Sequence, residues 1–255
     1  MRELAAIVVV AACVVAAGPA PAATAESPEC AVAADLAVAD YPLRRVAAAV
    51  ERTHSLDIVV VGAGSSTLVG PGGADLAYPA RLEAILPSRL PGVKIKIVTN
   101  VKLRRTAAEM AEGFDKILME NKPALVVWQS GTVDAITGVD PDEFRNTLEE
   151  GVEALHAGGA DVVLMNMQYS PRTESMIAIQ AYADSMRLVS QQREVPLLDR
   201  FAIMKHWNEQ GTFDLYAATK KLETAARIHD CLAQLLSDLI VDGIKLAREQ
   251  AKPVQ

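Results

Sequence analysis

Short runs of β-branched and other apolar residues alternate along the chain with longer segments in which apolar residues recur every three or four positions. The short runs predict strands buried on both faces, and the longer segments predict amphipathic helices. Five strands are expected, at residues 57–62, 93–99, 124–129, 161–165 and 195–198. This alternation is typical of a parallel sheet that is covered by helices on both faces.

Capping residues mark the ends of several expected helices. Thr106 and Glu109 have the spacing of a capping box, and Asp140 precedes a proline that suits the first turn of a helix. Further helices are expected at 176–191 and from 217 to 248. Repeated β–α units without a long linker predict one three-layer α/β domain of flavodoxin-like type with a five-stranded parallel sheet. Ligands of such sheets bind beyond the carboxyl ends of the strands.

The first 25 residues have the pattern of a secretory signal peptide. Arg2 precedes an apolar run, and small residues lead up to Ala25. The run is short for a membrane span of about 20 residues, so no span is expected after cleavage. A retained anchor helix and lipid attachment at Cys13 are the alternatives. We therefore expect a periplasmic or secreted protein.

The expected organisation has four parts. A signal peptide at 1–25 precedes an N-terminal arm at 26–56, the α/β domain at 57–249 and a tail at 250–255. After cleavage the remaining cysteines are Cys30 and Cys231. An oxidising compartment favours a disulfide between them, although two buried thiols are the alternative while their separation is unknown.

The composition narrows the choice of partners. Apolar residues make up 51% of the chain and charged residues 22%, which suits a globular domain with a full core. The net charge of −7 argues against a nucleic-acid partner, because phosphate binding needs clustered Lys and Arg. No H-E-x-x-H or C-x-x-C motif is present, so neither a metal nor a cofactor is expected.

The turn after the first expected strand reads Gly62-Ala63-Gly64-Ser65-Ser66-Thr67 and nearly matches a dinucleotide-binding motif. Thr67 replaces the third glycine, however, and the loop continues through Gly70 to Gly73 where a helix should begin. A nucleotide site is therefore a minor alternative.

The same turn resembles the first block, G-D-S-L-x-x-G, of the SGNH (GDSL-like) hydrolases. The resemblance implies that Ser66 is the nucleophile and that Ser65 replaces the Asp. Later segments at 78–82, 126–132, 160–165 and 200–204 also resemble this family in order and spacing. The resemblance implies the SGNH-like fold and an ester hydrolase activity.

Three blocks depart from the family pattern. Arg105 lies where the second block needs a glycine, so a side chain fills the space of a substrate oxygen. In the third block, Gly131-Thr132-Val133-Asp134 puts Val133, which cannot donate a hydrogen bond, in the place of the oxyanion-binding Asn.

The block that should supply D-x-x-H contains no histidine. One alignment gives Asp214 with Ala217, and another gives Lys220 with Glu223. An active enzyme would need another residue as its general base, and His229, Asp214 and His206 are the candidates. None of them matches the usual motif. His229 is more simply interpreted as a packing residue of the last helix.

These substitutions predict that the fold is kept and the catalytic machinery is mostly lost. We expect a cleft that binds a small-molecule or glycan ligand, ester-bearing or acetylated, with weak or no hydrolysis. The alternative is an active serine ester hydrolase that uses Ser66 with a non-standard base. A nucleotide-binding or purely structural domain is the remaining possibility, and the sequence does not indicate an oligomeric state.

Overall fold

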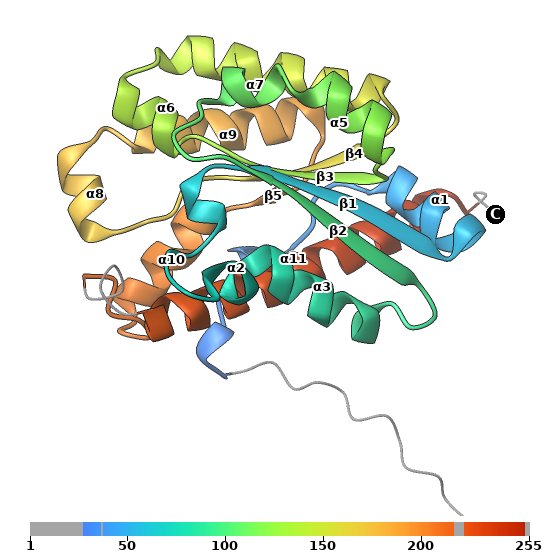
Figure 1. Cartoon of the computed structure of the whole chain (residues 1–255), viewed down its shortest axis with the longest axis horizontal. Coiled ribbons are helices and arrows are strands. Elements are labelled where there is room, and N and C mark those ends of the chain that lie inside the picture. Colours follow the sequence, from blue (N-terminus) through green and yellow to red (C-terminus); the bar gives the residue numbers. More distant parts are fainter. Residues whose placement is uncertain (1–27, 37, 217–221, 253–255) are drawn as a thin grey trace, which may run out of the picture.

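The computed structural model describes residues 28–36, 38–216 and 222–252. Five parallel strands form one sheet in the order β2-β1-β3-β4-β5, and helices cover both of its faces (Figure 1). This confirms the predicted three-layer α/β fold. The expected signal peptide lies outside the described residues.

The strands form where the apolar runs predict them. Their bounds are β1 Ser55–Gly62, β2 Lys94–Val101, β3 Leu125–Gln129, β4 Asp161–Met165 and β5 Leu197–Leu198. The side chains of β3 and β4 are buried throughout, because these strands have neighbours on both edges and helices on both faces. The edge strand β2 is partly exposed and longer than expected, and the other edge strand β5 is shorter.

Two helical layers enclose the sheet (Figure 1). The layer that contains the last helix includes α1 Arg44–Thr53, α2 Gly73–Leu76, α3 Tyr78–Arg89 and α11 Leu222–Gln250. The opposite layer includes α4 Ala107–Ala111, α5 Phe114–Asn121, α6 Thr132–Thr137, α7 Pro141–Ala157 and α9 Gln180–Arg193. The expected caps are present: Thr106 and Glu109 form the capping box of α4, and the Asp140 side chain accepts two amide hydrogen bonds at the start of α7.

Two helices differ from the expectation. The segment at 176–191 was expected to be one helix, but α8 ends at Met176 and α9 begins at Gln180. α8 is Pro171–Met176, and its first turn is capped by Ser170, whose hydroxyl accepts from the amide of Thr173. The first residues of the expected last helix, at 217–221, lie outside the described residues.

The segment expected as an N-terminal arm contributes to the core. It contains α1, which packs on α11 and β1, and the first residues of β1. The side chains of Leu43, Val46 and Val50 are buried there.

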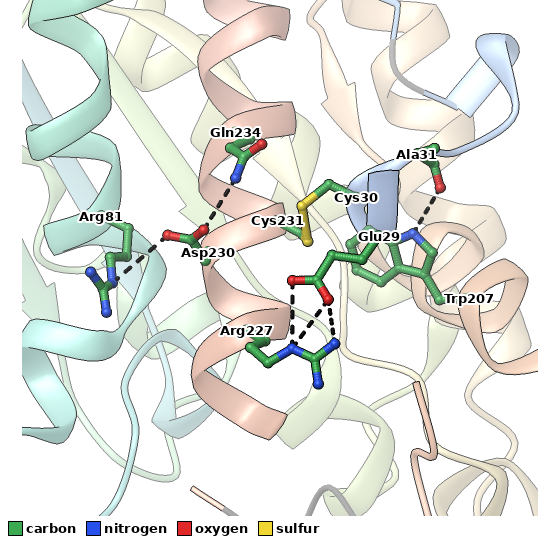
Figure 2. Close-up of a disulfide and its surroundings, with 9 residues drawn as sticks. All are labelled: Glu29, Cys30, Ala31, Arg81, Trp207, Arg227, Asp230, Cys231 and Gln234. Carbon is green, nitrogen blue, oxygen red and sulfur yellow. Dashed lines mark hydrogen bonds and ion pairs between the residues drawn. A yellow bond between two sulfur atoms is a disulfide. The ribbon is translucent and has the colours of Figure 1, made fainter. Parts of the chain in front are cut away.

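A disulfide between Cys30 and Cys231 ties the first described residues to α11 (Figure 2). The Cα atoms are 4.9 Å apart and 201 positions separate the two residues in sequence. Beside it, Glu29 pairs with Arg227, and the indole N–H of Trp207 donates to the carbonyl of Ala31 at 3.1 Å. The structure thus contains the bridge that the sequence allowed.

Among the described residues, no helix combines the length and the apolar character needed to cross a membrane. The carboxyl ends of the strands lie at the left of Figure 1, where α6, α8 and α2 begin. This edge of the sheet is where the fold predicts the site.

Candidate functional site

A cleft of about 720 Å³ opens at the carboxyl edge of the sheet. The loops after β1, β2, β3 and β4 line it, together with residues of α11 and of α10, which is Arg200–Glu209. The loops that we expected after β1 and β3 therefore face one cleft, because β1 and β3 are neighbours in the sheet.

The structure places Ser66 beneath the cleft surface. Its side chain is 1% exposed and does not line the cleft. The hydroxyl donates to Oε1 of Gln129 at 2.7 Å and is 3.1 Å from the hydroxyl of Tyr78. A Cβ added at Gly62 would lie 2.2 Å from the Ser66 hydroxyl, so the strand end needs glycine to accommodate this buried serine. These contacts bury the Ser66 hydroxyl and engage it with Gln129 and Tyr78.

Ala63, Gly64, Ser65 and Thr67 of this turn line the cleft, whereas Ser66 does not. The hydroxyl of Ser65 donates to Oε1 of Gln129 at 3.1 Å. A Cβ at Gly64 would lie 3.1 Å from Leu103, which is itself a cleft residue. The hydroxyl residues of the turn that line the cleft are therefore Ser65 and Thr67, on either side of the serine that the motif indicated.

The loop after β2 presents a different arginine from the expected one. Arg104 lines the cleft and has a positive φ of 58°. Arg105 does not line it, and its guanidinium instead donates to the backbone carbonyl of Glu109. The left-handed backbone at Arg104 turns the chain from β2 towards α4, which decides which side chain enters the cleft.

In the third block, residues 131–134, two residues line the cleft and two are buried in the core. Thr132 and Val133 line the cleft, and the Thr132 hydroxyl is buried with no hydrogen-bond partner among the described residues. Gly131 and Asp134 are buried. The Asp134 carboxylate accepts from the amides of Ala107 at 2.8 Å and Gly131 at 3.2 Å, and burial raises its pKa. Asp134 thus joins α4 to α6, and it is not placed to bind a ligand.

His229 is the one histidine of the chain that lines the cleft. It is 3% exposed, and its Nδ1 accepts the amide hydrogen of Tyr78 at 3.0 Å. Burial, together with the charge of Arg200, lowers its pKa well below the usual value, so the ring is neutral at pH 7. With Nδ1 accepting, the single proton of the neutral ring lies on Nε2. His229 therefore offers the cleft a donor and not the free acceptor that a general base needs.

Arg200 forms part of the cleft floor and is 1% exposed. One terminal nitrogen donates to the Ser65 carbonyl at 2.9 Å and the other to Oε1 of Gln168 at 3.4 Å, while Nε has no partner among the described residues. Burial lowers the pKa of Arg200 to about 10, which leaves the guanidinium charged at pH 7.

The other candidate bases within the described residues do not line the cleft. Asp214 is exposed, does not line the cleft, and accepts from the amide of Tyr216 at 3.1 Å. Glu223 is exposed on α11, and Lys220 lies outside the described residues. His206 is on α10 and does not line the cleft. In the described ranges, no group of three His, Cys, Asp or Glu side chains could hold a metal ion.

Sequence reasoning missed Arg200, Gln129 and Tyr78 as parts of the site. Arg200 lies two residues after the end of β5, so the rule that ligands bind after strand ends could have indicated it. The hydrogen bonds among Ser66, Gln129 and Tyr78 had no sequence signal, because they join residues up to 63 positions apart.

The sheet order and the cleft at its carboxyl edge are those of an SGNH-like α/β fold, and solved structures of known proteins share this fold. A crystal structure of TesA is 24% identical with a TM-score of 0.57, covering 72% of this chain and 99% of that one. A putative lipolytic protein of the G-D-S-L family from Desulfitobacterium hafniense is 18% identical with a TM-score of 0.56, covering 71% of this chain and 99% of its own. A mutant of Axe2, an acetyl-xylooligosaccharide esterase from Geobacillus, is 16% identical with a TM-score of 0.59, covering 72% and 94% respectively.

The sequence profile of the non-GDSL lipase-like family matches residues 29–246. The chain therefore belongs to the non-GDSL lipase-like family. No curated protein sequence is similar enough to count as a match.

Proposed function

We propose that this esterase-like protein binds an ester-bearing or related acyl ligand in its cleft and hydrolyses it weakly or not at all. The observation that carries the proposal is the hydrogen bond from the Tyr78 amide to Nδ1 of His229. It fixes the tautomer in which Nε2, the nitrogen that the Tyr78 amide leaves free, already carries a proton. A serine hydroxyl is a poor nucleophile without a base to accept its proton.

The surroundings of the serines support the same proposal. Both hydroxyls donate to Oε1 of Gln129, an amide oxygen that is far too weak a base to remove their protons. Among the described residues, no His or carboxylate is hydrogen-bonded to either serine. Val133 also offers no side-chain donor to an oxyanion, and the loss of one such donor costs about 3 to 4 kcal/mol of transition-state stabilisation.

The lining of the cleft bears on the choice of ligand. Most of its side chains are apolar, and Tyr169 is the one aromatic side chain among the described lining residues. This composition favours an acyl group over an extended glycan, which the sequence also allowed. The apolar N-terminal run and the Cys30–Cys231 bridge support a location outside the cytoplasm, since disulfides persist in oxidising compartments.

The test is hydrolysis of short-chain and medium-chain p-nitrophenyl esters by the purified protein beside its Ser65→Ala and Ser66→Ala variants. We expect all three rates to be equal and a serine-reactive phosphonate to label none of them. Turnover that Ser65→Ala abolishes would refute the proposal and make Ser65 the nucleophile. Turnover that only Ser66→Ala abolishes would instead restore the nucleophile that the motif indicated.

A further inference from the structure

The cleft floor holds a buried positive charge that lacks a negative partner. Two nitrogens of Arg200 donate to neutral oxygens, of Ser65 and Gln168, and its buried Nε–H has no acceptor in the described part of the chain. None of the ion pairs among the described residues includes Arg200, although the protein carries a net charge of −7. Burying a charge without a counter-ion is costly, so the fold retains an unfavourable feature at this place.

His229 adds a second donor close to this charge. Its Nδ1 is occupied by the Tyr78 amide, so the Nε2–H is the group available to a ligand, and no described residue accepts from it. Arg104 contributes a further positive side chain to the lining. No Asp or Glu is found among the described residues that line the cleft. The charged side chains among the described lining residues are therefore all positive, in a chain that is acidic overall.

The walls and mouth of the cleft are apolar. Leu68, Val133 and Ile228 line it, and Val69 and Leu103 are 90% and 70% exposed at its mouth. Exposed apolar side chains next to a concave site are typical of a ligand-binding surface. The cleft volume of about 720 Å³ lies within the range of small-molecule sites.

We propose that the cleft binds an amphiphilic monoanion, a carboxylate with an apolar chain, whose charged group is held by Arg200 and the Nε2–H of His229. Arg104 is exposed to solvent, whereas Arg200 is buried. The one buried guanidinium balances one negative charge, which favours a carboxylate over a doubly charged phosphate. The apolar chain lies along Leu68, Val133 and Ile228 towards the mouth. This inference rests on the proposed function, because an anion that is already a carboxylate has no ester bond left to cleave.

Calorimetric titration of the full protein with decanoate and with 1-decanol tests the anion directly. We expect decanoate to bind about ten- to a hundredfold more tightly, since hydrogen bonds to a charged group add this much. Arg200→Gln should remove the preference, whereas Arg145→Gln, which changes an arginine of α7 outside the cleft, should keep it. Equal affinity for the two probes, or a preference that survives in Arg200→Gln, would overturn the proposal.

Two further variants keep the test decisive if Arg200→Gln does not fold. His229→Gln should weaken decanoate binding more than decanol binding. Leu103→Asp changes an exposed side chain at the mouth and should repel decanoate selectively. Decyl phosphate that binds more tightly than decanoate would overturn the choice of a monoanion.

The outcomes also separate this inference from the proposed function. Equal binding of decanoate and decanol without ester hydrolysis would be consistent with the proposed binding function and would refute only the preference for an anionic ligand. Hydrolysis of a decanoyl ester that is lost in Ser65→Ala would overturn the proposed function itself.

Discussion

Two buried charges lie at opposite ends of the sheet and differ in how the fold satisfies them. Asp161 begins β4, and its carboxylate accepts from the amides of Arg45 at 2.7 Å and Val46 at 3.0 Å. The Arg45 guanidinium also pairs with it at 3.4 Å. Arg200 lies beyond the carboxyl ends of the strands and has only two neutral acceptors.

The difference separates a structural charge from one that is available to a ligand. Buried polar groups with a purely structural role normally form all of their hydrogen bonds. Asp161 does so by accepting from amides in the first turn of α1, which have no partner within the helix. Arg200 keeps an unused donor and lies at a cleft. An incompletely satisfied charge in a cleft is a candidate functional residue on physical grounds.

Helix α11 connects the two regions. Its first turns contribute Ile228 and His229 to the cleft, and further along the carbonyl of Gly243 accepts from the amide of Leu43 beside α1 at 2.9 Å. Substitutions that destabilise α11 should therefore affect both the cleft and the region around Asp161. A substitution of Asp161 or of Arg200 should affect only the end of the sheet where that residue lies.

Removal of the disulfide should have the largest effect on stability. The Cys30→Ala/Cys231→Ala double variant is expected to lose about 2 to 5 kcal/mol of unfolding free energy, because the bridge restricts the unfolded chain. Urea denaturation measures the loss. Two alkylatable thiols in the non-reduced protein, detected by mass spectrometry, would contradict the bridge itself.

Asp161→Ala should have the next largest effect. It leaves two amides of α1 and the Arg45 guanidinium without their acceptor, and we expect a loss of about 2 to 4 kcal/mol. Urea denaturation again measures it, with Asp242→Ala as a control, since that carboxylate pairs only at the surface of α11. A loss no greater than that of the control would show that the buried Asp161 carboxylate does not stabilise the fold.

His229 should make the protein less stable in mild acid. Its pKa in the folded state lies well below 6.5, so between that value and pH 6.5 the unfolded chain binds a proton that the folded chain does not. Stability therefore falls as the pH falls through this window, by at most about 1.4 kcal/mol per pH unit from this group. Burial raises the pKa of Asp134 and Asp161, which acts in the opposite direction.

The contribution of His229 is isolated by comparing the protein with His229→Gln at pH 7 and pH 5.5. We expect the variant to lose about 1 kcal/mol less over this interval. Nitrogen NMR of the imidazole gives an independent measurement, because it distinguishes the two tautomers. A ring protonated on Nδ1 at pH 7 would contradict both the hydrogen bond from Tyr78 and the argument against a general base.

Arg200→Met should have the smallest effect on stability. The variant loses two hydrogen bonds but also removes a buried charge without a counter-ion, so we expect a change within about 1 kcal/mol. Decanoate binding should be lost in the same variant. A destabilisation as large as that of Asp161→Ala would show that Arg200, like Asp161, is a structural charge and is not kept for a ligand.

The alternation of apolar runs and amphipathic segments was sufficient to predict the sheet and most helices. The central strands β1, β3 and β4 match within two residues, because a run such as Leu125–Gln129 can be buried only as a strand between neighbours. The helix predicted from residue 176 begins four residues later, at Gln180, and α8 was not predicted. The edge strands β2 and β5 also match within two residues, although β5 is only two residues long.

The location of the candidate site in the fold was predicted from the sequence, but the residues that line it were predicted only in part. The loops after β1 and β3 do meet at one cleft, which follows from the parallel sheet. The choice of Ser66 came from matching letters to a motif, and a turn can present any of several successive residues. The structure buries Ser66 and presents Ser65, because the Ser66 hydroxyl packs against Gly62 and Gln129.

The sequence by itself determined the α/β fold, the edge of the sheet that carries the cleft and the two cysteines available for a bridge. These depend on periodicity, strand direction and residue type, which are local or simple properties of the chain. Only the tertiary structure decided that Arg200 is buried without a counter-ion and that His229 faces the cleft with a proton on Nε2. Both depend on contacts between residues more than a hundred positions apart, such as Tyr78 with His229, and a local pattern carries no information about such contacts.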